Sequence, residues 1–437
     1  MSTENPVRST TNPQPALGTP AAEFAPLLRI ALGDRLPVRF AFWDGSGIGP
    51  VDGPGTIHVR SARALRRLFW SPGELGLGRA FVAQELDLEG DAFQVLLALQ
   101  SAAPRDARLG LDAAWSALRV ARKLGALGPP LPPPPEEARP GGWRHSRRRD
   151  ADVVSHHYDL GNDFYRLLLG SSLTYSCARF EGPATGLAEA QRAKHELICR
   201  KLGLDQRPDL RLLDVGCGWG SMALHAATTH GAEVVGVTIS QRQAKLARER
   251  VAAAGLTDRV EIRLQDYRDL RGETFDAISS VGMFEHVGVK QINGYFGTLR
   301  GLLRPRGRLL NHAISSVGGS RVSSRTFIGR YVFPDGELVD VGDLALAMER
   351  AGFEVRDVES LREHYARTVR AWTENLEADW DRAVALVGAA RARIWRLYLT
   401  GSAIGFTDGG IGVHQVLGVV PTRDGRTGMP ATRAHWG

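Results

Sequence analysis

The sequence predicts an α/β fold in which a mainly parallel sheet carries helices on both faces, with a smaller α+β domain before it. Three observations predict this arrangement. Apolar runs of strand length alternate with helical segments after residue 150. A glycine-rich turn follows the first of these runs, at 216–220. A proline-rich stretch separates this region from an earlier segment that has its own strand-like and helical pieces.

The chain of 437 residues is long for one domain, so we expect two. Residues 1–20 are rich in Ser, Thr, Asn and Pro and are expected to be a disordered N-terminus. Residues 21–128 form the first expected domain, 129–150 a Pro/Arg-rich linker, and 151–437 the second domain. The run Pro129–Pro135 favours an extended, semi-rigid linker and marks the boundary.

The first expected domain mixes both kinds of secondary structure. Its predicted strands are 38–43 and 55–59, and its predicted helices are 62–69, 92–99 and 111–124. It carries no recognisable catalytic constellation, so we look for chemistry in the second domain.

The second expected domain alternates strands with helices. Its predicted strands are 210–215, 233–237, 260–264, 275–281 and 309–313, and the clearest helices are 189–202 and 241–254, with a further helical segment at 221–229. Open sheets of this kind bind ligands at the carboxyl ends of their strands. Polar and glycine residues at those ends are therefore the candidate site.

The turn Asp214–Gly220 is the strongest local signal. Its glycines lack a Cβ atom, so the backbone at Gly216 and Gly218 can lie against a nucleoside and the following helix can point its N-terminus at the ligand. Alone this signal is weak, because many nucleotide-binding folds have such a turn.

The other strand ends narrow the choice of ligand. The second strand ends at Thr238, followed by Gln243, where a dinucleotide enzyme usually has an acid to hold the ribose. Asp266 can accept hydrogen bonds from an adenine amino group, and Tyr267 can cover the ring. Glu285 follows the fourth predicted strand, and His312 lies on the fifth. Because these strand ends are neighbours, we expect both residues near the cofactor.

Charge and cysteine content set further limits. The net charge of +7 is compatible with nucleic acid, with an anionic membrane surface or with no specific partner. The cluster Arg139–Arg149 contains Trp143 and suits anionic lipid headgroups, the alternative being a solvated linker. Three cysteines are too few and too scattered for a disulfide framework or a four-ligand zinc site, so a cytoplasmic protein without a metal is expected.

The second domain resembles the cyclopropane-fatty-acyl-phospholipid synthase family of S-adenosylmethionine (SAM)-dependent methyltransferases, over about 152–420. The resemblance rests on long motifs: HHYDLGNDFY (156–165), YSCARF (175–180), AEAQRAKHELICRKLGL (188–204), LLDVGCGWG (212–220), VVGVTISQRQ (234–243), LQDYRDL (264–270), VGMFEHVG (281–288), FIGRYVFPDGEL (327–338) and HYARTVRAW (364–372). It implies a Rossmann-like methyltransferase domain. The segment before the linker resembles the N-terminal lipid-binding-type domain of members that act on phospholipids.

The resemblance also implies roles for individual residues. Those matching SAM-contacting positions are Tyr175, Ser176, Gly216, Gly218, Thr238, Gln243, Asp266 and Tyr267. Those matching positions that hold a bicarbonate ion, the proposed general base, are Cys177, Glu285, His312, Tyr365 and the backbone at Ile314. The polar Asn311 before His312 departs from the commoner family pattern and leaves the product open.

The reaction expected from this resemblance is methyl transfer to the double bond of an unsaturated acyl chain in a membrane phospholipid, by an enzyme associated peripherally with the inner face of the membrane. Proton loss from the new methyl group gives a cyclopropane. A preceding hydride shift gives a mid-chain methylene that a partner reductase could convert to a methyl branch. A homo-oligomer is compatible with the sequence.

Two more distant classes remain as alternatives: a small-molecule or nucleic-acid methyltransferase, suggested by the basic charge, and a non-catalytic lipid-binding protein. The fourth strand end reads Met283-Phe284-Glu285-His286, which lacks the amide-Pro-aromatic pattern or nucleophile of nucleic-acid methylases, so no nucleic-acid partner is expected.

Overall fold

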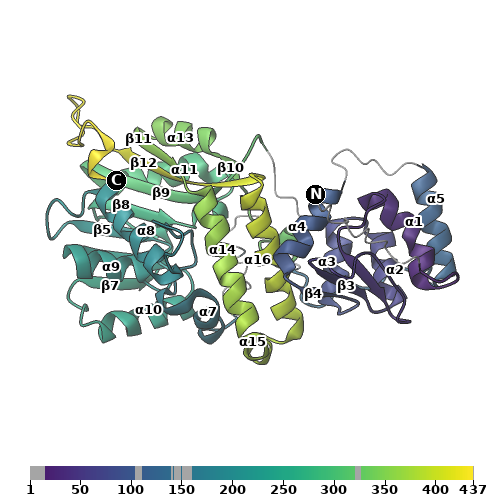
Figure 1. The fold of residues 1–437 in the computed structure, drawn as a ribbon. Helices are drawn as coiled ribbons and strands as arrows, with labels where there is room; N and C mark the ends of the chain where they lie inside the picture. The colour runs from purple at the N-terminus through teal and green to yellow at the C-terminus, as the bar shows by residue number, and fades with distance from the viewer. Residues whose placement is uncertain are drawn as a thin grey trace, which may run out of the picture. The chain divides into compact units, whose positions relative to one another are not determined.

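The computed structural model describes residues 15–103, 111–138, 141, 149, 160–319 and 326–436. The chain forms two compact units (Figure 1): unit 1 comprises Met1–Glu137 and Ala389–Gly401, and unit 2 comprises Ala138–Gly388 and Ser402–Gly437. Most of the expected disordered N-terminus, most of the basic cluster 139–149 and the start of the 156–165 motif lie outside the described residues.

Unit 1 is an α+β structure. In its described part, four strands form a sheet of order β2-β1-β3-β4, in which β1 and β3 are parallel and the other pairs antiparallel. The strands are β1 (Arg39–Phe42), β2 (Gly47–Ile48), β3 (Gly55–Val59) and β4 (Leu86–Gly90). The helices are α1 (Pro20–Leu32), α2 (Ala62–Trp70), α3 (Glu74–Val82), α4 (Ala92–Ala102) and α5 (Leu111–Lys123).

Local sequence explains several of these elements. The hydroxyl of Thr19 accepts a hydrogen bond from the Ala22 amide, and Pro20 occupies the first turn of α1, where a missing N–H costs nothing. Asp91 caps α4 in the same way, accepting from the amides of Phe93 and Gln94. The predicted strands and helices of this segment are present, whereas α1, α3, β2 and β4 were not predicted.

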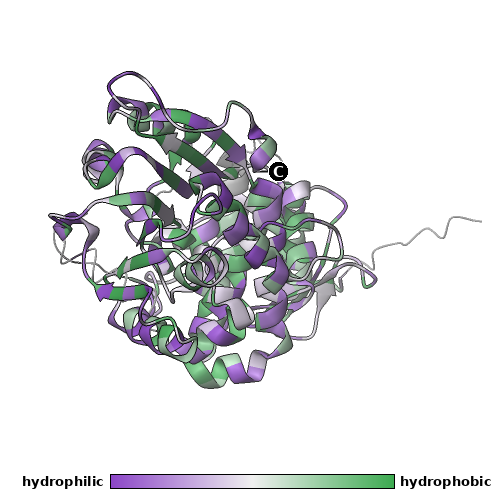
Figure 2. Ribbon diagram, turned by 90° about the vertical axis from the view of Figure 1, so that its left-hand side faces the viewer, coloured by the Kyte–Doolittle hydropathy of each residue, from purple (hydrophilic) through white to green (hydrophobic). Residues whose placement is uncertain are grey.

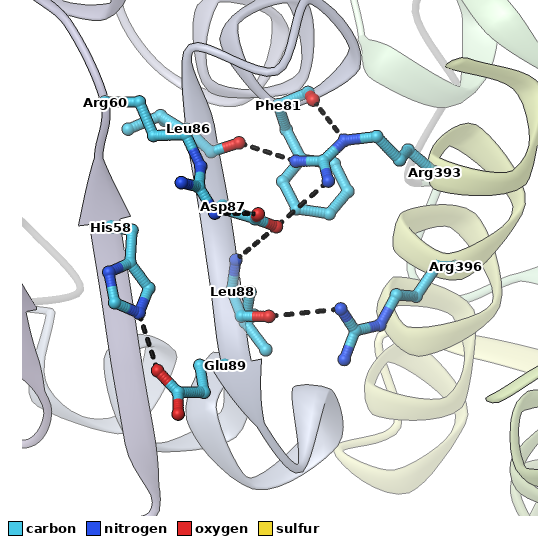
Figure 3. A network of polar contacts seen from close by, with 9 residues as sticks. All are labelled: His58, Arg60, Phe81, Leu86, Asp87, Leu88, Glu89, Arg393 and Arg396. Atoms are coloured by element: carbon cyan, nitrogen blue, oxygen red, sulfur yellow. Dashed lines mark hydrogen bonds and ion pairs between the residues drawn. The ribbon is translucent and has the colours of Figure 1, made fainter. Parts of the chain in front are cut away.

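The first part of α16 (Ala389–Thr407) belongs to unit 1. Figure 3 shows how it is held: the Arg393 guanidinium donates to the carbonyl of Phe81 at 2.7 Å and of Leu86 at 2.6 Å, and pairs with Asp87 at 2.9 Å. Arg396 donates to the carbonyl of Leu88 at 3.1 Å. The sequence-based division assigned residues 389–401 to the second domain, because nothing local in them indicates contacts with β4.

Unit 2 contains a larger sheet, whose eight strands within the described residues follow the order β11-β12-β9-β8-β5-β6-β7, with β10 beside β9. The strands are β5 (Arg211–Val215), β6 (Glu233–Thr238), β7 (Val260–Leu264), β8 (Phe275–Val281), β9 (Leu303–Ser316), β10 (Val339–Asp340), β11 (Glu354–Ser360) and β12 (Ile411–Val419).

Strands β5 to β9 pair in parallel, whereas β12 and β11 extend the sheet antiparallel beyond β9. The mainly parallel sheet expected from the sequence is confirmed. The predicted strand 309–313 was too short: β9 is Leu303–Ser316, because it pairs with β8 on one side and along its length with β12 on the other.

Both faces of this sheet are covered. Neighbouring residues of β5 show the alternation: Leu212 packs with α8, α9 and α10, while Leu213 packs with α11 and α13. Figure 2 shows hydrophobic and hydrophilic residues alternating around the helices. The helices of this unit are α7 (Asn162–Leu169), α8 (Leu187–Leu202), α9 (Ser221–His230), α10 (Gln241–Ala253), α11 (Ile292–Gly301), α12 (Phe327–Tyr331), α13 (Val341–Arg350), α14 (Arg362–Ala378), α15 (Trp380–Val387) and the end of α16.

Among the described residues, no helix has the length and apolar character needed to cross a membrane.

Candidate active site

A cavity of about 350 Å³ opens at the carboxyl ends of β5, β6, β7 and β8. The strand order reverses direction on either side of β5, so this is the switch point at which such sheets bind ligands. All eight residues expected to contact the cofactor line the cavity: Tyr175, Ser176, Gly216, Gly218, Thr238, Gln243, Asp266 and Tyr267.

The glycine turn forms one wall of this cavity. Gly216 and Gly218 have φ angles of 75° and 55°, which side-chain-bearing residues rarely adopt. A Cβ atom at Gly216 would lie 2.9 Å from Cγ of Met283, so this position also requires glycine for space. The amides of Gly216 and Cys217 donate to the carbonyl of Val237, which ties the turn to the neighbouring strand β6.

Polar groups at the next two strand ends are already oriented. The Thr238 hydroxyl donates to the side-chain oxygen of Gln243 at 3.0 Å. The Asp266 carboxylate accepts from both the backbone amide and the guanidinium of Arg268, at distances between 2.6 and 3.1 Å. A carboxylate has acceptor sites beyond these, and fixed in this way Asp266 presents them in one orientation.

Aromatic rings also line the cavity. The ring of Tyr267 meets Tyr295 edge-on at 5.5 Å, and Tyr165 packs against Trp219 at 4.8 Å. Tyr295, Trp219 and Tyr267 line the cavity, so it offers aromatic faces of the kind that a purine ring or a sulfonium cation favours.

A buried lysine and aspartate also line the cavity, and the sequence did not single them out. Nζ of Lys194 donates to the Ser176 hydroxyl at 3.0 Å, and Oδ1 of Asp214 accepts from Ser279 at 2.7 Å. Burial lowers the pKa of Lys194 to about 7 and raises that of Asp214 to about 6, each partly offset by the charge of the other. The sequence did offer a signal for each: Asp214 begins the turn Asp214–Gly220, and Lys194 lies in the motif at 188–204.

The five predicted catalytic residues are absent from the lining of this cavity but lie next to it in the fold. Glu285 follows β8, which pairs with β9 so that Val281 stands opposite His312. Oε1 of Glu285 accepts from the Ile314 amide at 2.7 Å. The structure therefore brings Glu285, His312 and Ile314 together.

Glu285 and His312 each present a buried polar atom that has no hydrogen-bond partner among the described residues: Oε2 of Glu285 and Nε2 of His312. Burial raises the pKa of Glu285 to about 7, so its carboxyl group exchanges a proton near neutral pH. Burial, helped by the charges of Lys194 and Lys201, holds the pKa of His312 well below its usual range, so the imidazole is neutral.

Cys177 and Tyr365 lie together near the start of α14. The Cys177 thiol contacts the carbonyl of Leu361 at 3.6 Å, and the same carbonyl accepts from the Tyr365 amide. Burial raises the pKa of Cys177, which keeps it a neutral thiol. Tyr365 packs on Phe406 at 4.5 Å and on Trp372 at 6.0 Å. Trp372 in turn packs on the cavity residue Tyr175 at 5.2 Å, so an aromatic chain joins the two groups of residues.

Residues 145–416 match the family model described as mycolic acid cyclopropane synthetase, which is more than half of the chain. The chain belongs to the mycolic acid cyclopropane synthetase family. Together with its relatives, this makes it a SAM-dependent methyltransferase.

The chain is similar to two named enzymes and to a solved structure. It is 40% identical over 412 residues to the probable fatty acid methyltransferase Rv3720 of Mycobacterium tuberculosis, covering 92% of this chain and 95% of the relative. It is 39% identical over 272 residues to the cyclopropane-fatty-acyl-phospholipid synthase of Escherichia coli, covering 62% and 69%. Its fold matches the crystal structure of mycolic acid cyclopropane synthase CmaA1 complexed with SAH and CTAB, with a TM-score of 0.58, 35% identity, and coverage of 62% of this chain and 98% of that one.

Proposed function

We propose that this methyltransferase transfers the methyl carbon of SAM to the double bond of an unsaturated acyl chain in a membrane phospholipid, forming a cyclopropane ring. The observation that carries the proposal is a pairing of two features. One is a cavity lined by every predicted cofactor residue. The other is a pair of buried, unpartnered polar atoms on Glu285 and His312 at the adjoining strand ends of the described chain.

When bound, SAM supplies a methyl group carried on positively charged sulfur. We assign Thr238 and Gln243 to its ribose hydroxyls, and Asp266 with Tyr267 to its adenine. The hydrogen bond between Thr238 and Gln243 holds both side chains at the end of β6, and the bonds from Arg268 hold Asp266. Tyr175, Ser176 and the turn at Gly216 and Gly218 line the remainder of the same cavity.

The residues near Glu285 fit a small oxyanion such as bicarbonate. Nε2 of His312 and Oε2 of Glu285 are buried and without a partner in the described structure, so each has a hydrogen bond left to make. Glu285 with a pKa of about 7 can carry the proton that lets it donate to an anion rather than repel it. Cys177 and Tyr365 complete the assignment. The Ile314 amide, expected to contact the anion itself, instead donates to Oε1 of Glu285 and orients that carboxyl group.

These residues suit a reaction through a cation on the acyl chain. Water would trap such a cation as an alcohol, so the site must be dry. The side chains of His312 and Cys177 are essentially inaccessible, and Tyr365 is sandwiched between Trp372 and Phe406. A base held between Glu285 and His312 would then remove the proton whose loss closes the ring.

Unit 1 supports association with a membrane surface. Phe69, Trp70 and Trp115 are 40%, 51% and 64% exposed, although aromatic side chains are usually buried. Arg149, from the predicted basic cluster, is instead paired with Asp335 through two hydrogen bonds of 2.5 and 2.6 Å. We therefore assign the surface contact to unit 1 aromatics and to basic residues other than Arg149, on the inner face of the membrane.

Incubation of the full chain with methyl-labelled SAM tests the proposal. Vesicles of a monounsaturated phospholipid are expected to take up label in the acyl chain, with a mass gain of one CH2 and the upfield proton resonances of a cyclopropane. Vesicles of the saturated phospholipid, the free unsaturated fatty acid and RNA are the comparison substrates. Labelling of RNA or of the saturated lipid, with the unsaturated phospholipid unlabelled, would contradict the proposal.

A mid-chain methylene is the second candidate product, because the polar Asn311 departs from the commoner family pattern and leaves the product open. Asn311 lies beside His312 on β9; its side-chain oxygen accepts from Tyr295 at 3.1 Å, while its buried Nδ2 has no partner within the described residues. Consecutive residues of a strand face opposite sides of the sheet, so the Asn311 side chain is turned away from that of His312 and toward Tyr295, which lines the cofactor cavity. Asn311 would therefore influence where the proton is lost through the position of Tyr295. The same labelled product distinguishes the two, because a methylene gives vinylic proton resonances. A methylene product would also make a partner reductase necessary for a methyl branch.

A further inference from the structure

A cluster of metal-ligating side chains lies between α8 and α9, outside the lining of the cofactor cavity. Cys199 comes from α8, and His225 and His230 come from α9. One ligand atom from each of these three residues lies within 4.8 Å of the other two. None of the three lines the cavity, so the proposed reaction gives the cluster no role.

A carboxylate completes the group. Oε2 of Glu196, one turn before Cys199 on α8, lies 3.2 Å from Nε2 of His225 and 2.9 Å from Nε2 of His230. Its other oxygen, Oε1, accepts from Arg200 at 2.8 Å, so the Arg200 ion pair leaves Oε2 directed between the two imidazoles. Two ring nitrogens thus already meet at one anionic oxygen.

The donor set identifies the class of metal. Hard cations such as Ca²⁺ and Mg²⁺ require oxygen ligands, whereas a thiolate with two imidazoles and one carboxylate suits tetrahedral Zn²⁺. Tetrahedral zinc with bonds of about 2.0 Å to nitrogen and about 2.3 Å to one sulfur separates its ligand atoms by roughly 3.3 to 3.5 Å. The observed limit of 4.8 Å therefore requires side-chain movements of only about 1 Å.

The cluster is buried at Cys199 and partly exposed at the other three residues, so an ion could enter from solvent and then be held. Cys199 is completely buried in the apolar layer under α8, which would keep a metal-bound thiolate away from water. The side chains of His225, His230 and Glu196 retain 15%, 9% and 26% of their accessible surface, so the site is open on one side. The buried side of the cluster, at Cys199, matches the protein-lined character of a structural zinc site.

We propose that Cys199, His225 and His230, with Glu196 as the fourth ligand, bind one Zn²⁺ that ties α8 to α9. Because α9 begins at Ser221, directly after the glycine turn, a metal at its far end would fix the helix that supports that turn. The proposal revises the expectation of no metal: cysteine counting considered only sites of several cysteines, and the fold brings two histidines to a single one.

Cobalt titration of the full chain, first stripped of metal by a chelator, tests the proposal. One equivalent of Co²⁺ is expected to produce tetrahedral d–d absorption and a sulfur-to-cobalt charge-transfer band, and Zn²⁺ is expected to displace it. Saturating Zn²⁺ should also raise the Tm, since a ligand that binds the native state stabilises it. Absence of these bands, or no saturation near one equivalent, would overturn the proposal whatever the variants do.

Variants locate the site. Cys199→Ser should abolish the charge-transfer band, and His230→Gln should weaken Zn²⁺ binding by at least about 10-fold, as expected for loss of a ligand. His58→Ala is the matched control, because His58 also pairs with a glutamate, Glu89, but lies in unit 1. A charge-transfer band that persists in Cys199→Ser, or equal weakening by His58→Ala, would refute the assignment. Circular dichroism of each metal-free variant shows whether it is folded.

Discussion

The side-chain nitrogen of Gln415 lies 3.2 Å from Nδ1 of His312, and both side chains are buried. The two residues stand directly opposite each other across β12 and β9. With the amide nitrogen donating, Nδ1 is the acceptor and the ring proton sits on Nε2, the atom without a partner in the described structure. Gln415 therefore decides which nitrogen of His312 can donate to a bound anion.

Replacing Gln415 should impair turnover without impairing cofactor binding. Gln415→Leu frees the tautomer of His312, and Gln415→Glu favours the opposite one by accepting from Nδ1. We expect kcat to fall about 10- to 100-fold in the first and further in the second, with the Kd of SAM changed less than about 2-fold. Single-turnover rates and SAM titrations measure the two effects. Gln94→Leu, an exposed glutamine in unit 1, is the control; wild-type turnover in Gln415→Glu would contradict the role.

Glu285→Gln should stop the reaction at a later stage than SAM binding. Glutamine keeps the oxygen that accepts from Ile314 but cannot hold or transfer the proton that the proposed base site needs. We expect kcat to fall by at least about 100-fold, the size seen when one preorganised group is removed, and SAM affinity to stay within about 3-fold. Glu349→Gln on the exposed side of α13 is the matched change. If Glu285→Gln turned over at the wild-type rate, the base would have to lie elsewhere.

The free energy of unfolding should vary with pH in a way that reflects the raised pKa of Glu285. Its folded-state pKa of about 7 exceeds the ordinary value of 4.5, so the native state binds more protons than the unfolded state between these values. Stability contributed by protonated Glu285 is therefore complete below about pH 4.5 and is lost as the pH rises to about 7.

The difference in unfolding free energy between wild type and Glu285→Gln isolates this effect from other titrations. As the pH rises from 4.5 to 7, the unfolding free energy of the wild type should fall relative to that of Glu285→Gln by up to about 3 kcal/mol, the equivalent of that pKa change. Urea denaturation at several pH values measures it, and a difference that does not vary with pH would rule out the raised pKa.

Substituting two glycines that have similar backbone conformations distinguishes an effect on cofactor binding from an effect of backbone strain. Gly218 and Gly255 have φ angles of 55° and 67°, and a Cβ atom at either meets no protein atom within 4 Å. Only Gly218 lines the cavity. Alanine at either position should lower the free energy of unfolding by about 1 kcal/mol. Only Gly218→Ala should also weaken SAM binding, by at least about 10-fold. Calorimetry measures the SAM affinity of both variants, and equal affinities would show that SAM does not bind against this turn.

Binding to anionic vesicles should depend on salt and on exposed aromatic residues. Raising ionic strength screens surface charge, so affinity is expected to fall several-fold between low and high salt. Trp115→Ser should lower it further, whereas Leu346→Ser, an exposed leucine of unit 2, should not. Vesicle co-sedimentation measures both. Affinity independent of salt would mean that inserted apolar groups dominate, and an unchanged Trp115→Ser would move the contact away from α5.

The sequence by itself determined the central parallel strands and the positions at their ends. Strands β7 and β8 have the predicted bounds, and β5 and β6 differ from them by one residue. Strands β5 and β6 are buried on both faces and are nearly continuous apolar runs, whereas the edge strand β7 alternates buried and more exposed residues. The order of parallel strands then places Gly216, Thr238 and Asp266 at one edge. Local pattern and strand direction were sufficient for that edge.

Only the tertiary structure decided which distant residues complete the sites. Gln415 reaches His312 across 103 positions of chain, Lys194 meets Ser176 in the interior, and Cys199 meets His225 and His230 between two helices. The antiparallel strands β11 and β12 and the contacts of residues 389–401 were equally invisible in the sequence. Periodicity records which side of an element is buried, whereas the partner it is buried against depends on packing between elements far apart in the chain.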